Sequence, residues 1–186
     1  MPNWCINSAT ITCPSKEIYE KLIGAIIEKN WFKTFAPLGL DPNEYEGGLD
    51  FHKACEIWNT KWDAVEIEIT SRDDTEYILD VSFDTAWSPP LGVYKIMNNN
   101  FEIEITAYYY ELGCSFFGRY IKNKTEEINE SFEIPCSHDE LSEIRNSIDS
   151  DLDDFMSSTW ELLEEEWEEE WEEEWEEEWE EESTNT

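Results

Sequence analysis

Basic residues are scarce in this chain, and its C-terminal part has none. Twelve Lys and Arg stand against 46 Asp and Glu in 186 residues, which gives a formal net charge of −34, and nothing after Arg145 is basic. Without the 16 Glu of residues 161–182 the formal charge would still be −18. Because nucleic-acid affinity depends mainly on Lys and Arg that neutralise phosphates, we expect no direct nucleic-acid binding. We expect attraction to basic surfaces instead, including surfaces that hold nucleic acid.

Long apolar runs and catalytic motifs are missing as well. No stretch approaches 18 apolar residues, so we expect no membrane span, and the N-terminus lacks the basic and apolar segments of a secretory signal. His52 and His138 supply the only imidazoles, and no Gly-rich phosphate loop, nucleophile elbow or zinc-type spacing is present. The sequence therefore predicts a non-enzymatic protein without cofactor or metal.

Cysteines are few and odd in number. They lie mostly in apolar segments, at Cys5, Cys13, Cys55, Cys114 and Cys136. This pattern favours buried free thiols in a reducing compartment over a disulfide framework. Together with the missing signal segment, it predicts a cytoplasmic protein.

Alternating apolar and polar residues predict strands at residues 4–12, 65–69, 77–83, 101–109 and 115–121. Helices are expected at about residues 14–30 and after Ser88, which would serve as N-cap before two prolines. Several strands have one apolar and one acidic or polar face, which is typical of an antiparallel sheet covered on one side. The order βαββαβ with one added C-terminal strand is the ferredoxin-like arrangement of an α+β protein.

The remaining segments define the expected domain organisation. Residues 31–64 lack clean periodicity and contain several Pro and Gly, so they are expected to form an irregular insertion. Residues 1–136 would form the ferredoxin-like domain, and residues 137–186 a helical, acidic Trp/Glu-repeat tail.

Four motifs occur in order along the first two thirds of the chain: Asn3-Trp4-Cys5-Ile6-Asn7, Trp58-Asn59-Thr60-Lys61-Trp62-Asp63, Phe83-Asp84-Thr85-Ala86-Trp87-Ser88-Pro89-Pro90 and Tyr110-Glu111-Leu112-Gly113-Cys114-Ser115-Phe116-Phe117-Gly118. Their order and spacing resemble the YubB-type (Api-ninety-two-like) ferredoxin-like family of plasmid and phage proteins, over roughly residues 1–122. The resemblance implies this fold and an origin in a mobile element of a bacterial host, but no established activity. The chain departs from the family's pattern at Asn59, where Gly is usual, and in its tail.

The motifs fall at strand ends or at the entry to a helix, so they are expected to meet at one rim of the sheet. One interpretation is a shallow Trp-lined site for a small ligand or peptide, formed by Asn3, Trp4, Asn7, Lys61, Trp62, Asp63, Trp87, Ser88, Tyr110 and Glu111. A helix N-terminus at Ser88 would add a weak preference for anions. The alternative is one aromatic core under the insertion, with the polar residues paired locally.

The tail repeats Trp every four residues, at Trp167, Trp171, Trp175 and Trp179, between Glu triplets. As a helix it would carry its Trp on one stripe that advances about 40° per repeat. Thirteen Glu pairs at i,i+4 would each cost roughly 0.2–0.5 kcal/mol, or roughly 3–6 kcal/mol together. An isolated tail is therefore expected to be a marginal helix at pH 7, stable mainly when its Trp stripe docks or its charge is neutralised.

The charge density of the tail suggests a partner. Three Glu per four residues place one negative charge every ~2 Å of helix axis, close to the ~1.7 Å of duplex DNA. The tail, with Glu168, Glu172 and Glu176 beside the Trp stripe, is thus a candidate nucleic-acid mimic that binds a basic host protein, such as a nucleic-acid-binding defence or regulatory factor. The alternative is a solvated appendage. A third hypothesis is an enzyme of unrecognised type that uses Asp63 or Glu111.

Overall fold

The computed structural model describes residues 3–39 and 51–184, with side chains up to Glu169. The elements follow in the order β1 (Trp4–Thr12), α1 (Lys16–Ile27), α2 (Trp31–Phe35), α3 (Phe51–Trp58), β2 (Val65–Asp73), β3 (Ile78–Ala86), α4 (Leu91–Phe101), β4 (Glu104–Glu111), β5 (Phe116–Lys122), β6 (Glu127–Glu133), α5 (His138–Ser147) and α6 (Ser150–Thr184). The chain divides into two compact units, Met1–Ile134 and Pro135–Thr186. Among the described residues, no helix has both the length and the apolar composition needed to cross a membrane.

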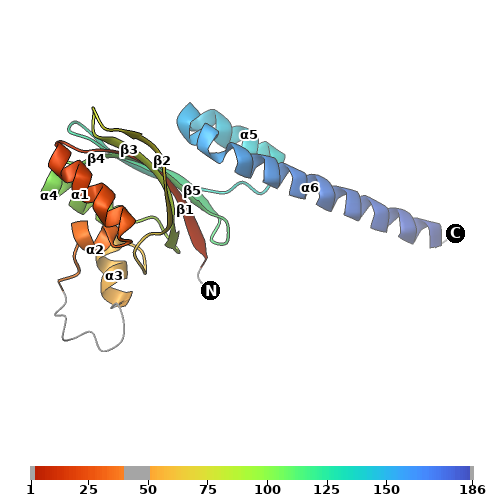
Figure 1. The fold of residues 1–186 in the computed structure, drawn as a ribbon. Coiled ribbons are helices and arrows are strands. Elements are labelled where there is room, and N and C mark those ends of the chain that lie inside the picture. The colour runs from red at the N-terminus through yellow and green to blue at the C-terminus, as the bar shows by residue number, and fades with distance from the viewer. Residues whose placement is uncertain (1–2, 40–50, 185–186) are drawn as a thin grey trace. The chain divides into compact units, whose positions relative to one another are not determined.

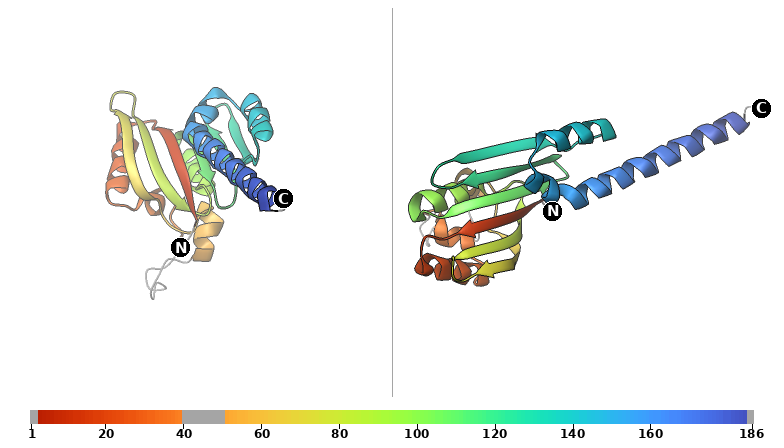
Figure 2. Two further views of the ribbon diagram at one scale, coloured as in Figure 1. Left: turned by 90° about the vertical axis from the view of Figure 1, so that its right-hand side faces the viewer. Right: turned by 90° about the horizontal axis from the view of Figure 1, so that it is seen from above.

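The first unit is built on a six-stranded antiparallel sheet with the strand order β2-β3-β1-β4-β5-β6 (Figure 2). The four strands β2-β3-β1-β4, with helical crossovers between β1 and β2 and between β3 and β4, have the ferredoxin-like arrangement. Strands β5 and β6 extend the sheet beyond β4. The fold predicted from the sequence is therefore correct in its class and in its central topology.

The prediction of one added strand is wrong, because β6 follows β5. Its sequence, Glu-Ile-Asn-Glu-Ser-Phe-Glu, has too few apolar residues to alternate clearly. The turn before it carries a better signal. Asn123 Oδ1 accepts hydrogen bonds from the backbone N–H groups of Thr125 (2.8 Å) and Glu126 (3.0 Å), as Asn does in many turns.

Helices α1 to α4 all lie on one side of the sheet (Figure 1). The strand residues that point toward them are buried, and they form one core cluster with the apolar stripes of the helices. Its members include Ile11, Leu22, Leu79, Val81, Val93, Met97, Ile105 and Ala107. Burial of such aliphatic side chains contributes about 1.5–3 kcal/mol each to folding.

The expected irregular insertion at residues 31–64 contains two helices that complete this core. Trp31, Phe32, Phe35 and Trp58 are each at most 1% exposed, and the indole N–H of Trp58 donates to the carbonyl of Ala36 (2.6 Å). Helices α2 and α3 have five and eight residues, too few for a helical repeat to stand out in the sequence. Residues 40–50 of the expected insertion lie outside the described residues.

The connection from β3 to β4 also differs from the prediction. Helix α4 begins at Leu91, with Pro90 and not Ser88 as its N-cap, and the Ser88 hydroxyl donates to the carbonyl of Asn59. The helix continues through Phe101, and Glu102 ends it in a left-handed conformation (φ 55°). Strand β4 therefore begins three residues later than the alternation suggested.

The second unit contains α5 and α6. Ser137 caps α5 by accepting a hydrogen bond from the backbone N–H of Glu140 (3.3 Å). The Glu140 carboxylate accepts in turn from the N–H of Cys136 (2.9 Å), and this bond lowers the pKa of Glu140. Helix α6 runs without interruption for 35 residues (Figure 1), about 50 Å at the usual rise.

Candidate functional site

Antiparallel pairing brings three of the four sequence motifs to one end of the sheet. Trp4, at the start of β1, pairs with Ala86, at the end of β3. Ile6 pairs with Tyr110, near the end of β4. The backbone N–H of Trp87 donates to the carbonyl of Asn3 (3.0 Å) and extends this contact beyond the strands. We call this end of the sheet the rim.

The fourth motif is attached to the rim by hydrogen bonds that follow α3. Asn59 donates from Nδ2 to the carbonyl of Pro89 (3.1 Å), and the Thr60 hydroxyl donates to the carbonyl of Ala86 (2.9 Å). Asn59 has a φ of 68°, a left-handed conformation that Gly adopts freely and Asn tolerates. The departure from Gly at this position is therefore compatible with the same turn.

Asn7 is a structural residue of the rim. Its side chain is 1% exposed, and its Nδ2 donates to the carbonyls of Cys5 (2.8 Å) and Phe83 (3.3 Å) and approaches the Thr85 hydroxyl (2.9 Å). These bonds join β1 to β3 inside the unit. This buried amide therefore joins the two strands and is not accessible to a ligand.

The side chain of Asp63 is also engaged in hydrogen bonds with the backbone. Its carboxylate accepts hydrogen bonds from the N–H groups of Phe32 (2.9 Å), Lys33 (3.2 Å) and Ala64 (3.0 Å). Burial raises the pKa of Asp63, and these hydrogen bonds oppose the increase. The residue therefore caps the start of α2, a role that sequence spacing did not reveal because α2 lies about 30 residues away.

Glu111 stabilises the turn between β4 and β5. It is 2% exposed and accepts from the N–H groups of Gly113 (2.8 Å) and Cys114 (2.5 Å). A Cβ at Gly113 would collide with the side chain of Asn3, so a larger residue at this position would require the Asn3 side chain to move. Like Asn7 and Asp63, Glu111 has its polar side-chain atoms engaged in hydrogen bonds within the first unit.

The aromatic residues of the rim, in contrast, are partly exposed to solvent. Trp4, Phe51 and Trp87 are 38%, 44% and 45% exposed. The Trp62 ring lies between two of them, with centroids 6.0 Å from Trp4 and 6.3 Å from Phe51. These four residues, which we call the aromatic patch, lie outside the buried core cluster. Phe51 is a member that sequence reasoning missed.

Lys61 and Tyr110 complete the expected rim set. The Lys61 ammonium lies 4.9 Å from the Phe51 ring centroid and 5.1 Å from that of Trp62, in the range of cation–π contacts. Tyr110 is half-buried on β4. The rim thus presents aromatic rings, two of which already contact a cation.

The first part of the tail packs within the second unit. Asp153 accepts hydrogen bonds from the guanidinium of Arg145 (3.1 Å) and from the indole N–H of Trp160 (2.9 Å). The imidazole of His138 packs edge-on against Trp167, with centroids 5.1 Å apart. Helices α5 and α6 therefore form a hairpin that includes the first Trp of the repeat. The side chains of Trp171, Trp175, Trp179, Glu172 and Glu176 lie outside the described residues, and Glu168 is exposed.

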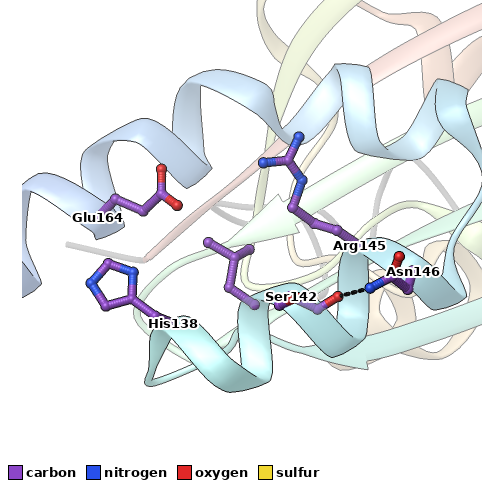
Figure 3. Close-up of a pocket in the computed structure, with 6 residues that line it drawn as sticks. His138, Ser142, Arg145, Asn146 and Glu164 are labelled. Atoms are coloured by element: carbon purple, nitrogen blue, oxygen red, sulfur yellow. Dashed lines mark hydrogen bonds between the residues drawn. The ribbon is translucent and has the colours of Figure 1, made fainter.

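A groove of about 280 Å³ lies between α5 and α6 (Figure 3), lined by His138, Leu141, Ser142, Arg145, Asn146 and Glu164. The five α5 residues have helical spacing and share one face. Sequence reasoning missed this groove, although that spacing could have indicated it. In the part of the chain that the structure describes, no cluster of three possible metal ligands occurs.

The family comparison agrees with this fold. A family described as the ferredoxin-like domain in Api92-like protein matches residues 57–185. The match thus begins after the first motif, includes the other three and continues through the tail. Among solved structures, the chain is similar to the protein Api92 from Yersinia pseudotuberculosis, at 16% identity and a TM-score of 0.39, over 50% of this chain and 33% of that one. The chain therefore matches about a third of that relative's length. No match was found among curated proteins.

Proposed function

The chain belongs to the family of Api92-like proteins with a ferredoxin-like domain, and we propose that it is a non-enzymatic binding protein of a phage or plasmid. In this proposal helix α6 acts as a nucleic-acid mimic. Its partner is a basic host protein whose own ligand is nucleic acid, such as a defence or regulatory factor.

The continuous helix carries this proposal. Residues 161–182 contain 16 Glu, and they lie in a helix that is unbroken from Ser150 to Thr184. In a helix the carboxylates are spaced along the axis by ~2 Å on average, close to the ~1.7 Å between phosphate charges of duplex DNA. A groove whose Lys and Arg match a nucleic-acid backbone would meet a similar charge density here.

The hairpin explains how so acidic a helix can form. Starting a helix is unfavourable because several residues are ordered for one hydrogen bond. Here the contacts of Arg145 with Asp153 and of His138 with Trp167 hold α6 against α5, and the hydrogen bond from Trp160 to Asp153 adds a contact within α6. The Glu repeat then only has to extend a helix that already exists.

The proposal can be tested by affinity purification from the bacterial host at 50 mM and 500 mM salt. We expect the full chain to recover a basic protein at low salt, and we expect duplex DNA to displace it. High salt should release it because exposed charge–charge attraction is screened. A matched variant with Gln at the 16 Glu positions of residues 161–182 keeps the Trp stripe and should recover nothing.

Three results would contradict the mimic. Recovery of the same partner at both salt concentrations is one. Recovery by a chain that lacks residues 151–186 is another. The third is a partner that DNA does not displace, because a mimic and the nucleic acid must compete for one surface.

The exposed rings of the rim favour a second candidate function, a module that binds a peptide or small ligand. Trp87 is 45% exposed and adopts a φ of 75°, a conformation that costs an L-residue about 1–2 kcal/mol. Strain of this kind often accompanies binding sites. If the rim is the site, Trp87→Ala should abolish binding while removal of residues 151–186 leaves it intact. The opposite pattern would point to the tail.

A further inference from the structure

A carboxylate, Asp84, lies beside Trp4 of the aromatic patch, and a second, Glu66, lies beside Asp84. Across β1 and β3, Trp4 pairs with Ala86 and Ile6 pairs with Asp84. Trp4 and Asp84 are therefore diagonal neighbours on the same face of the sheet, a relation that separates residues by about 7–8 Å. On the other side of β3, Asp84 pairs with Val65, so Glu66 follows directly in β2.

These two carboxylates repel each other. Burial raises the pKa of Asp84, and the Glu66 carboxylate raises it further. None of the ion pairs that the structure describes includes either residue. Glu66 has a φ of 48° and lies where the register of β2 shifts, so the two like charges are held near each other by an irregular strand.

The rings beside them already accept a cation. The Lys61 ammonium lies over Phe51 and Trp62, while Trp4, tilted by 50° to Trp62, remains 38% exposed. The surrounding charge favours a further cation, because residues 1–134 contain 23 acidic and 11 basic residues. The attraction would therefore exist without the tail.

We propose that the aromatic patch, with Asp84 and Glu66 at its border, binds an arginine side chain of a basic peptide segment. This inference rests on the second candidate function, since it names the ligand chemistry of the rim. The flat guanidinium stacks on an indole face while its N–H groups donate to carboxylates at the ring edge. Lysine lacks the planar fork that satisfies both requirements at once.

The test uses the full chain and the peptide N-acetyl-Gly-Arg-Gly-amide, followed by NMR of the Trp indole N–H signals. We expect the signals of Trp4 and Trp62, assigned with Trp4→Phe and Trp62→Phe, to shift on titration. The same peptide with citrulline, which keeps the shape but lacks the charge, should bind about tenfold more weakly. The tail Trp signals report in the same spectra whether the peptide binds there instead.

Variants distinguish the contribution of the two rim carboxylates from that of the protein's overall negative charge. Asp84→Asn and Glu66→Gln should each weaken binding about three- to tenfold. Asp80→Asn removes the same charge from the same face of β3, about 13 Å further along the strand, and should change binding less than twofold. Equal binding of the citrulline peptide would overturn the arginine site but keep the rim as a peptide site. Shifts confined to the tail Trp, or no shift at all, would overturn both.

Discussion

At the residue scale, Gly92 sets how closely α4 approaches α3. A Cβ at this position would collide with the carbonyl group of Ile57 and reach the carbonyl carbon of Trp58 (3.2 Å). We expect Gly92→Ala to lower the free energy of unfolding by about 1–3 kcal/mol, as overpacking does. Urea denaturation measures this change.

Gly24→Ala is the matched control. A Cβ at Gly24 meets nothing within 4 Å, and Gly in a helix interior is less stable than Ala by about 0.5–1 kcal/mol. This variant should therefore be more stable than the original chain. Equal destabilisation of both variants would show that the approach of α3 to α4 is not tight.

Also at the residue scale, the raised pKa of Asp84 predicts that the stability of the fold depends on pH. Because burial and Glu66 raise its pKa in the folded state, the folded chain binds the proton more readily than the unfolded one. The resulting stabilisation is present below the unfolded pKa of about 3.9 and is lost as the pH rises through the raised folded pKa. Asp84→Asn should therefore stabilise the chain at pH 7 and give no gain at pH 3.

Urea unfolding at both pH values measures this effect. Glu66→Gln removes one cause of the raised pKa, so its stabilisation at pH 7 should add incompletely to that of Asp84→Asn. Full additivity would mean that the two carboxylates do not interact.

At the element scale, the hairpin of α5 and α6 depends on Asp153. Its carboxylate accepts hydrogen bonds from Arg145 of α5 and from the indole N–H of Trp160 within α6, so Asp153→Ala removes both bonds. We expect a loss of about 1–3 kcal/mol, seen as a lower midpoint when helix content is followed by circular dichroism on heating. Asp154→Ala, at an exposed neighbouring position, should change the midpoint little.

The Glu repeat has its own pH response. A peptide of residues 161–184 lacks the α5 contacts and carries the Glu–Glu repulsion, so it should be largely unfolded at pH 7. Approach to the usual Glu pKa of about 4.3 removes this repulsion. Its helicity by circular dichroism should therefore rise between pH 7 and pH 4.5, and an unchanged spectrum would contradict the charge argument.

At the scale of the whole molecule, the first unit should fold alone. The core cluster is drawn entirely from residues 9–120, and all six strands end by Glu133. A chain ending at Ile134 should therefore keep a cooperative thermal transition and a near-ultraviolet circular dichroism signal. A gradual transition without that signal would show that Pro135–Thr186 is required for the fold.

The candidate site was only partly predictable. The motif positions at strand ends indicated that Trp4, Trp87 and Tyr110 would meet, because antiparallel neighbours share an end. Nothing near Asp63 in the sequence indicated that its carboxylate caps α2, and nothing near Glu111 separated a turn-forming carboxylate from a ligand-binding one. Phe51 was not predicted because it lies in a segment without clear periodicity.

The sequence by itself determined the features that depend on local pattern: the alternation that makes the strands, the four-residue repeat of the tail and its charge density. Only the tertiary structure decided which side chains are available to a partner. Strand register and the packing of α2 and α3 depend on contacts between residues far apart in the chain. Those contacts bury Asn7, occupy Asp63 and leave Trp4 and Trp87 exposed.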